Sequence, residues 1–295
     1  MNNKYNMTDI SNNYGYAPNM EELDRKLSGI QSNLDNWMTP NNLAACLGYM
    51  DLTSLNPTDT CSKVATMAQK VSKFKNIYPN YPTPASICVF SNLGKAVREN
   101  ITVPDVNVTV VAGVFPSSQS FLEVKLLECK MAVENGADEV DIVLALNKFL
   151  ANNFVETALE ISEIKKAING KRLKVILETG ALATPEKIAA ASFLAMEAGA
   201  DFIKTSTGKM EPAATPMAAI IMCECIKAFY AKTGKKIGFK PAGGMVNPKD
   251  AICYLAIVDS ILGKEWLTPQ LFRLGASRLA NNLLSELEQN TVNYY

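Results

Sequence analysis

The chain has 295 residues, of which 48% are hydrophobic and 20% are charged, a composition typical of a globular protein with one large domain or two average ones. Lysine plus arginine and aspartate plus glutamate each total 29, and no basic block stands out, which argues against nucleic acid as the main partner. The absence of histidine excludes Ser-His-Asp and Cys-His nucleophile pairs and His-ligated metal sites, so any proton transfer must fall to Lys, Asp, Glu, Tyr or Cys.

Cysteine spacing and hydropathy narrow the class further. The seven cysteines are scattered and contain no C-x-x-C pair, so we expect neither a disulfide framework nor a zinc site, and a reducing, cytoplasmic location fits. No run of 18 or more apolar residues occurs, and the N-terminal residues are polar, so neither a membrane span nor a secretory signal is expected. No nucleic acid, membrane or metal partner is therefore indicated.

The first 40 residues are rich in Asn, Tyr and Met. They predict an N-terminal extension over residues 1–40, with one short helix around Met20–Leu34, that packs against the main domain or stays partly mobile. From about Leu43 the pattern becomes regular: a short apolar run, a turn, then a longer stretch with helical spacing. This rhythm predicts one domain over residues 41–290, followed by a C-terminal tail over residues 291–295.

Eight strand–helix units follow one another without a break in composition. Thr184 places a capping hydroxyl before Pro185, and Gly136 and Gly199 stand where helices should end. An unbroken series of this kind favours a (β/α)8 TIM barrel of the α/β class over a doubly wound sheet. The predicted strands are Gly48–Leu52, Ser86–Ser91, Asn107–Ala112, Glu139–Leu144, Leu173–Glu178, Asp201–Thr205, Ile237–Lys240 and Phe272–Gly275, and the helices between them include Ser120–Asn135, Phe154–Asn169, Pro185–Ala198, Pro216–Lys232 and Pro248–Leu262.

Side-chain alternation along the strands predicts which residues face the barrel axis. In Glu139–Leu144 the apolar residues occupy alternate positions and should face the helices, which turns Asp141 inward. The same reasoning turns Lys174 and Glu178 inward in the next strand, whereas two apolar residues before Lys204 leave its direction ambiguous. Barrel interiors are normally packed with Val, Ile and Leu, so buried charges there are paired or used. If Lys204 joins the inward set, the barrel mouth holds Asp51, Asp141 and Glu178 facing Lys174, Lys204 and Lys240.

Lys204 and Lys240 each end a short apolar run and precede small residues that indicate a tight loop. A free lysine has a pKa of about 10.4, whereas an amine nucleophile needs a value nearer ~7–8. Closing that gap takes about 4 kcal/mol, which desolvation and a like-charged neighbour can supply. The pair therefore indicates a Schiff-base lysine. For the motif from Lys204 to Lys209 alone, the alternative is a strand that runs into a polar turn, with Lys209 simply solvated.

Two Gly-rich loops follow the last two strands, Pro241-Ala-Gly-Gly244 and Gly275-Ala-Ser277. Such loops can aim backbone N–H groups at a phosphate, helped by the dipole of the following helix, and this is the customary phosphate site of the barrel. A plain turn is the alternative for each loop alone. Cys88 and the Cys223-Glu-Cys225 segment are more typical of packing than of chemistry.

Six segments, found at nearly every predicted strand, form a distinctive set. They are Met50-Asp-Leu-Thr-Ser-Leu-Asn56, Ala137-Asp-Glu-Val-Asp-Ile-Val143, Leu173-Lys-Val-Ile-Leu-Glu-Thr-Gly180, Asp201-Phe-Ile-Lys-Thr-Ser-Thr-Gly-Lys209, Gly238-Phe-Lys-Pro-Ala-Gly-Gly244 and Phe272-Arg-Leu-Gly-Ala-Ser277. In order from about residue 45 to residue 285, this set strongly resembles the deoxyribose-phosphate aldolase family. The segment Glu265–Arg273 is more similar to the longer, animal-type branch than to the short bacterial one.

The resemblance implies a class I aldolase, without metal or cofactor, that reversibly joins acetaldehyde to D-glyceraldehyde 3-phosphate and serves deoxyribonucleoside catabolism. It implies that Lys204 forms the imine, that Lys240 lowers the pKa of Lys204 and moves protons, and that Asp141 works with Lys240 and a water in the relay. The iminium acts as the electron sink, which avoids a free carbanion. A cytoplasmic homo-oligomer, with a dimer favoured, is also implied. The same resemblance assigns substrate contacts to Asp51, Lys174, Thr207 and Lys209, and phosphate binding to Gly208, Gly243, Gly244, Gly275, Ser277 and Arg278.

Two positions depart from the family pattern. The family usually has Arg two residues after the Gly-Gly pair, where this chain has Val246, and it usually has Ser or Thr after Gly-Ala-Ser, where this chain has Arg278. We hypothesise that Arg278 partly replaces the missing charge from the opposite side of the phosphate site.

The chain ends in Asn293-Tyr-Tyr295. A tail tyrosine can reach the active site in bacterial family members, and a phenol could carry a proton here, but we expect a disordered tail. Two alternatives to the aldolase stay open: another lysine-dependent sugar-phosphate aldolase or dehydratase, and a binding protein that kept the barrel and lost turnover.

Overall fold

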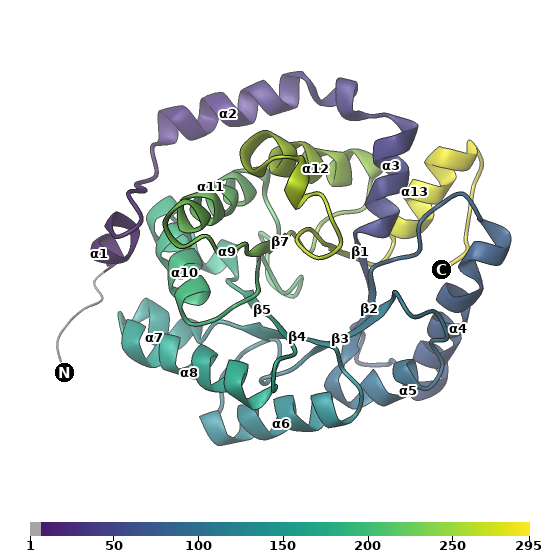
Figure 1. Ribbon diagram of the computed structural model, residues 1–295, viewed down its shortest axis with the longest axis horizontal. Coiled ribbons are helices and arrows are strands. Elements are labelled where there is room, and N and C mark those ends of the chain that lie inside the picture. Colours follow the sequence, from purple (N-terminus) through teal and green to yellow (C-terminus); the bar gives the residue numbers. More distant parts are fainter. Residues whose placement is uncertain (1–6) are drawn as a thin grey trace.

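The computed structural model describes residues 7–295, and its centre is a barrel of eight parallel strands (Figure 1). The sheet order is β7-β6-β5-β4-β3-β2-β1-β8, and bridges from Phe239 to Phe272 and from Ala242 to Gly275 join the two outer strands. The predicted TIM barrel is confirmed. The strands are β1 (Met50–Thr53), β2 (Ser86–Phe90), β3 (Asn107–Val111), β4 (Glu139–Val143), β5 (Arg172–Ile176), β6 (Phe202–Lys204), β7 (Gly238–Lys240) and β8 (Leu274–Ala276).

Helices surround the barrel, and several begin at a threonine cap. Thr39, Thr60, Thr184 and Thr215 each accept a hydrogen bond from the backbone N–H three residues further on, and a proline follows three of them. The cap predicted at Thr184 is confirmed. The helices after the N-terminal segment are α4 (Cys61–Ile77), η2 (Ser91–Leu93), α5 (Gly94–Arg98), α6 (Leu122–Glu134), α7 (Leu146–Leu150), α8 (Phe154–Ala167), α9 (Thr179–Leu182), α10 (Pro185–Glu197), α11 (Pro216–Thr233), α12 (Pro248–Leu262), η3 (Lys264–Trp266) and α13 (Leu279–Glu288).

The strands alternate as predicted between an apolar outer face and a charged inner face. On β4, Val140 and Ile142 belong to the hydrophobic core that packs under the helices, and Asp141 between them is buried on the axis side. On β5, Val175 is in the same core, and Lys174 next to it points inward. The interior of an eight-stranded barrel is only wide enough for side chains to fill it. Charged side chains that point inward from neighbouring strands therefore lie close together.

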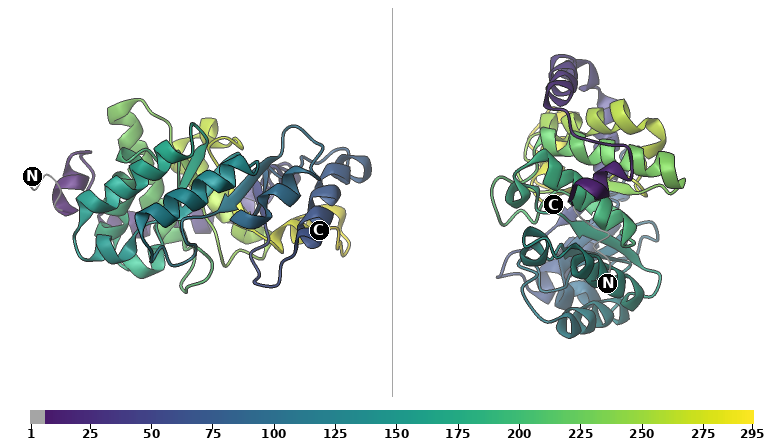
Figure 2. Two further views of the ribbon diagram at one scale, coloured as in Figure 1. Left: turned by 90° about the horizontal axis from the view of Figure 1, so that it is seen from below. Right: turned by 90° about the vertical axis from the view of Figure 1, so that its left-hand side faces the viewer.

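The N-terminal segment covers one side of the barrel. Its elements are α1 (Met7–Asn12), α2 (Met20–Ser32), η1 (Leu34–Trp37) and α3 (Pro40–Gly48). Helix α1 packs on α10, and α2 packs on α11 and α12, an arrangement visible as an arch outside those helices (Figure 1). Figure 2 shows α1, in dark purple, at the rim of the molecule. The Tyr14 ring stacks on Phe193 of α10 at 4.4 Å between centroids. The first six residues of the predicted extension lie outside the described part of the chain.

Within residues 7–295, no helix combines the length and the apolar character that crossing a membrane requires. All seven cysteines are free thiols, six of them buried and Cys61 exposed.

Candidate active site

Asp141 is the centre of a buried charge cluster inside the barrel. Its Oδ2 lies 2.8 Å from Lys204 Nζ on β6 and 2.8 Å from Lys240 Nζ on β7, and its Oδ1 lies 3.0 Å from Lys174 Nζ on β5. All four side chains are almost completely buried. Strand register explains the convergence, because Asp141 is level with Lys174, and Lys204 is level with Lys240. The structure thus brings together Asp141, Lys174 and Lys240, which were predicted to face inward. It also turns Lys204 inward, whose direction the alternation left ambiguous.

A second layer lies deeper in the barrel around Glu139, two residues before Asp141 on β4. Its carboxylate accepts hydrogen bonds from Thr109 Oγ1 and Arg273 Nη2, each at 2.8 Å, and lies 2.6 Å from Lys174 Nζ. We call Glu139, Arg273 and Thr109 the inner layer, and Lys204, Lys240 and Asp141 the outer layer. Lys174 contacts both, so the two layers are joined through one ammonium group.

Asp51 on β1 also links the layers. Its Oδ1 accepts hydrogen bonds from Ser86 Oγ at 2.7 Å and Arg273 Nη1 at 2.5 Å, and its Oδ2 lies 2.5 Å from Lys240 Nζ. Lys174 Nζ is 3.6 Å from the same Oδ2. Asp51 is therefore a second carboxylate partner of Lys240, in addition to Asp141.

Sequence reasoning missed Arg273, which is 1% exposed and forms ion pairs with both Asp51 and Glu139. The signal was present in the eighth strand. Leu274 belongs to the core under the helices, so alternation turns its neighbours Arg273 and Gly275 toward the axis.

The cluster shifts the proton affinities of its two outer lysines in opposite directions. Burial lowers the pKa of Lys204, and the positive charge of Lys240 adds to that effect, while Asp141 opposes it. Burial also disfavours the charge on Lys240, but the carboxylates of Asp141 and Asp51 outweigh it, so the pKa of Lys240 is raised. Of the two neighbours, Lys204 is thus the amine that gives up its proton first.

The acids of the cluster stay ionised despite their burial. Burial alone would raise the pKa of Asp141, but the ammonium groups of Lys174, Lys204 and Lys240 bring it well below its usual range. Lys174 and Arg273 outweigh burial in the same way and lower the pKa of Glu139 to about 2. A buried carboxylate persists only with such compensation.

A cavity of about 350 Å³ opens above the cluster at the C-terminal ends of the strands. Lys204 is the member of the outer layer that lines it, and Lys209 lines it too, with Nζ donating to the Leu55 carbonyl oxygen at 2.7 Å. Every residue predicted to bind phosphate lines this cavity, as do three other predicted site residues. The predicted residues that line the cavity are Lys204, Thr207, Gly208, Lys209, Gly243, Gly244, Gly275, Ser277 and Arg278.

Three predicted positions differ from expectation. Asp51 and Lys174, expected to touch substrate, lie beneath the cavity and do not line it, because they sit in mid-strand and are consumed by ion pairs. Glu178, expected to face the lysines, accepts hydrogen bonds from Thr207 N at 3.2 Å and Thr207 Oγ1 at 2.5 Å. Strand β5 ends at Ile176, and Glu178 has a φ of 55°, which turns its side chain toward the β6 loop.

The glycines of the cavity permit close backbone approach. A Cβ on Gly243, whose φ is 82°, would lie 2.9 Å from Gly208 Cα and 2.8 Å from the Ala213 side chain. A Cβ on Gly275 would lie 2.9 Å from Lys240 Cε. The first glycine lets the β6 and β7 loops meet, and the second leaves room for the Lys240 side chain.

Arg278 and Val246 lie on the same cavity wall. The Arg278 side chain is exposed, and Asn282, one turn further along α13, donates from Nδ2 to the Val246 carbonyl oxygen at 2.9 Å. The start of α13 is therefore fixed against the β7 loop, and Arg278 and Val246 line the same cavity.

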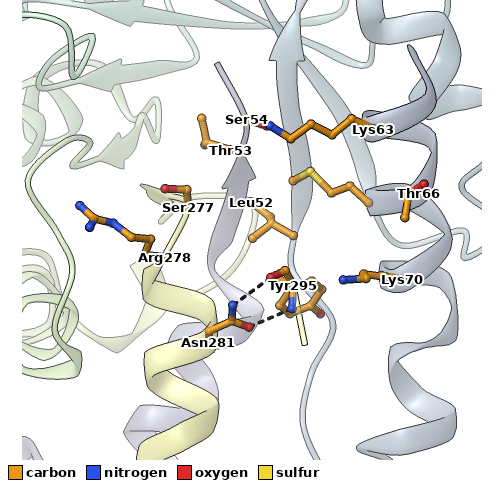
Figure 3. Close-up of a pocket in the computed structure, with 11 residues that line it drawn as sticks. Leu52, Thr53, Ser54, Lys63, Thr66, Lys70, Ser277, Arg278, Asn281 and Tyr295 are labelled. Carbon is orange, nitrogen blue, oxygen red and sulfur yellow. Dashed lines mark hydrogen bonds between the residues drawn. The ribbon is translucent and has the colours of Figure 1, made fainter. Parts of the chain in front are cut away.

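The C-terminal tail is ordered, so the expectation of a disordered tail is wrong. Asn281 Oδ1 accepts from the backbone N–H groups of Tyr294 and Tyr295, and the Tyr295 ring stacks on Phe74 of α4 at 5.6 Å. Tyr295 lines a neighbouring cavity of about 460 Å³ (Figure 3), which shares Thr53, Ser277 and Arg278 with the cavity above the cluster. Arg278 extends away from Tyr295 in that view, and Tyr295 does not line the cavity that contains Lys204.

Comparison with known proteins shows which family this chain belongs to. The sequence profile of the DeoC/LacD family of aldolases matches residues 46–256. Deoxyribose-phosphate aldolase from Homo sapiens is 38% identical over 264 residues, which cover 86% of this chain and 83% of the human protein. The Mus musculus protein of that name is 37% identical over 266 residues, with the same shares covered.

A solved structure gives the same fold. The tetrameric structure of deoxyribose phosphate aldolase from Aeropyrum pernix superposes with a TM-score of 0.65 and 24% identity, covering 91% of this chain and 98% of that one. The resemblance drawn from the strand-end motifs is confirmed by the profile and by the animal relatives. This chain belongs to the DeoC/LacD family of aldolases.

Proposed function

We propose that this aldolase forms an imine through Lys204 and reversibly cleaves 2-deoxy-D-ribose 5-phosphate to acetaldehyde and D-glyceraldehyde 3-phosphate. The observation that carries the mechanism is the burial of Lys204 and Lys240 against one oxygen of Asp141, each at 2.8 Å. Burial lowers the pKa of Lys204, whereas the neighbouring carboxylates outweigh burial and raise the pKa of Lys240. The names of the human and mouse relatives support the substrate.

Imine formation begins at the neutral amine of Lys204. The nitrogen adds to the aldehyde carbon C1 of the open-chain sugar, and the carbinolamine oxygen leaves as water after taking a proton from Lys240. Lys240 is suited to give that proton because its Nζ and that of Lys204 share one oxygen of Asp141, each at 2.8 Å. The positive iminium then favours the neutral form of Lys240, since like charges disfavour each other.

Carbon–carbon cleavage follows from the iminium. Neutral Lys240 takes the proton of the C3 hydroxyl, the C2–C3 bond breaks, and its electron pair moves into the iminium to give an enamine and D-glyceraldehyde 3-phosphate. Lys240 next returns a proton to C2. Water then hydrolyses the new iminium and passes its surplus proton to Lys240, which releases acetaldehyde and restores both lysines.

Phosphate binding falls to the Gly-rich loops of the cavity. Gly208, Gly243 and Gly244 have positive φ angles, and the Gly275–Ser277 loop leads into α13. We assign the compensating positive charge to Arg278, because it shares the cavity wall with Val246. A charge-assisted contact of this kind is worth roughly 1.5–3 kcal/mol.

We also propose that the enzyme works in the cytoplasm as a homo-oligomer. The free state of all seven cysteines supports a reducing compartment. The tetrameric relative from Aeropyrum pernix supports association.

Borohydride trapping tests the proposed mechanism. We expect acetaldehyde plus borohydride to add a two-carbon group to Lys204, located by peptide mass spectrometry, and Lys204→Leu to abolish the adduct. Lys209→Leu is the matched control, since Lys209 lines the same cavity and should leave trapping at Lys204 intact. Absence of an adduct in the folded wild-type protein would favour a binding protein that kept the barrel without turnover.

A further inference from the structure

A second cavity lies beside the one that contains Lys204, and the proposed aldol chemistry leaves it unused. Its volume is about 460 Å³, against about 350 Å³ for the cavity above the charge cluster. We call the larger space the Tyr295 cavity and the smaller one the Lys204 cavity. Thr53, Ser277 and Arg278 line both, so the two spaces share part of their walls.

The ordered tail forms one wall of the Tyr295 cavity. Asn281 Nδ2 donates to the main-chain oxygen of Tyr295 at 2.9 Å, which ties the tail to α13 (Figure 3). Tyr294 Oη donates to the Lys70 carbonyl oxygen at 2.6 Å, which ties the tail to α4. The tail is thus bonded to the helices on both sides, and the cavity has a fixed wall between them.

The lining of the Tyr295 cavity has an excess of positive charge. Lys63, Lys70 and Arg278 line it, and no aspartate or glutamate of the described chain does. Lys63 is paired with Asp59 at 2.5 Å. Neither Lys70 nor Arg278 has an ion-pair partner among residues 7–295. Two cations are therefore available to an anion in this cavity.

Apolar side chains accompany these cations. Helix α4 presents Lys63, Met67 and Lys70 to the cavity, and their spacing by about one helical turn places them on one face of the helix. Leu52 on β1 lies across from α4 (Figure 3). An anion with an apolar body matches this lining, because its body can leave water against Leu52 and Met67.

A phosphate monoester of an apolar alcohol or phenol has the required chemistry. Its two negative charges can be met by the ammonium group of Lys70 and the guanidinium group of Arg278. The volume of about 460 Å³ lies within the range of roughly 300–1,000 Å³ that is usual for small-molecule sites. Inorganic phosphate has the same charge but would leave the apolar lining in contact with water.

Arg278 connects the two cavities. Its side chain is exposed, lines both spaces and extends away from Tyr295 (Figure 3). No ion pair with residues 7–295 holds the guanidinium group in that direction, and exposed side chains change rotamer within nanoseconds. An anion in the Tyr295 cavity can therefore draw Arg278 away from a phosphate in the Lys204 cavity.

We propose that the Tyr295 cavity is a second ligand site, for a phosphate monoester with an apolar body, and that its ligand inhibits the enzyme through Arg278. The phosphate of this ligand binds Lys70 and Arg278, and its body packs on Leu52 and Met67. Occupancy weakens the binding of the phosphorylated sugar and leaves the lysine cluster unchanged. The inhibition rests on the phosphate role proposed for Arg278, whereas binding to the cavity does not.

Titration calorimetry with phenyl phosphate tests the site. We expect Lys70→Ser to raise the dissociation constant by about tenfold or more, because a charge-assisted contact is lost. Lys73→Ser is the matched control, since Lys73 is an exposed lysine of the same helix that does not line the cavity, and the constant should stay within about twofold. Equal constants in Lys70→Ser and the wild type, or no binding to the wild type, would overturn the site.

Two further titrations test the apolar body of the ligand. Thr66→Phe adds a ring to the cavity from an exposed position of α4 and should weaken the binding of phenyl phosphate by about tenfold. Inorganic phosphate should bind the wild type about tenfold or more weakly than phenyl phosphate, since it buries no apolar surface. Unchanged binding in Thr66→Phe, or equal affinity for the two phosphates, would contradict the assigned ligand class.

Steady-state kinetics test the inhibition separately from binding. Phenyl phosphate should raise KM for 2-deoxyribose 5-phosphate by up to about tenfold and leave kcat unchanged, the effect expected for loss of Arg278. Cleavage of unphosphorylated 2-deoxyribose should not respond. The rise in KM should disappear in Lys70→Ser; if it persists there, phenyl phosphate competes in the Lys204 cavity and the proposed inhibition is wrong. A protein that binds phenyl phosphate in the calorimeter but does not cleave the sugar would contradict the proposed function and support the site.

Discussion

The inner and outer layers of the barrel contain the same kinds of charge but differ in how completely those charges are paired. In the inner layer, Glu139 and Arg273 are joined by two hydrogen bonds, and Arg273 has a further carboxylate partner in Asp51. In the outer layer, Lys204 and Lys240 share a single oxygen of Asp141. Each charge of the inner layer is paired, whereas the outer layer contains two ammonium groups and a single carboxylate.

This difference separates a structural role from a chemical one. Three buried carboxylates, those of Asp51, Glu139 and Asp141, are matched in number by three cations, Lys174, Lys240 and Arg273. Lys204 is the fourth cation and has no carboxylate of its own. A buried ammonium without full compensation lowers its pKa. The inner layer thus helps to fix the positions of the charged groups that surround Lys204.

Replacing Lys204, the fourth cation of the cluster, should have the largest effect on turnover. In Lys204→Leu we expect kcat to fall by about 10⁴-fold or more, because the variant lacks the amine that we propose forms the imine. Folding should persist, since Asp141 keeps Lys174 and Lys240 as partners. Steady-state cleavage of 2-deoxyribose 5-phosphate, with circular dichroism as the check on folding, measures it. Retained turnover would assign the imine to another residue.

Removing Arg273 from the inner layer should lower the stability of the fold more than it lowers the activity. In Arg273→Met we expect the free energy of unfolding to fall by about 3–5 kcal/mol, because Glu139 and Asp51 lose a buried partner. Arg172→Met is the matched control: Arg172 also pairs with Glu139 but its side chain is 28% exposed, so we expect about 1 kcal/mol or less. Urea unfolding of both variants decides the point. Equal losses would mean that the inner layer is not special.

Removing the other outer lysine should slow turnover and move its pH dependence. In Lys240→Met we expect kcat to fall by about 10²–10³-fold, because the variant lacks the group that we propose carries the protons. Lys240 lowers the pKa of Lys204 and also neutralises Asp141, so its removal raises the pKa of Lys204 on both counts. The acid limb of the rate profile should therefore shift to higher pH. A shift to lower pH would contradict the assignment of Lys240 as the repelling charge.

The smallest effect is expected from replacing Arg278, which lines the cavity, and it should be an effect on KM. In Arg278→Ser we expect KM for the phosphorylated sugar to rise by about tenfold, with little change in kcat, because the variant lacks the charge that we propose compensates for Val246. Lys70→Ser is the control, since Lys70 lines the cavity of Tyr295 rather than that of Lys204. The same KM in both variants would remove Arg278 from the phosphate site.

Alternation along short strands predicted the convergence of Asp141, Lys174 and Lys240, because a side chain's direction within a strand is a local property. The same rule applied to Phe272–Gly275 would have found Arg273. It failed at Glu178, since the strand ends two residues earlier and a left-handed φ turns the backbone. The position of Tyr295 depends on contacts with α4 and Asn281 that are distant in sequence, and no local pattern encodes them.

The pH dependence of reductive alkylation at single lysines tests the central claim most directly. Acetaldehyde and cyanoborohydride would be applied over a range of pH, with peptide mass spectrometry comparing the rates at Lys204 and Lys209. We predict that Lys204 reacts at a pH below 10.5, the ordinary pKa of the side chain, and that its rate there exceeds the rate at Lys209. If Lys204 reacts only at or above that pH, its pKa is not lowered and the account is wrong.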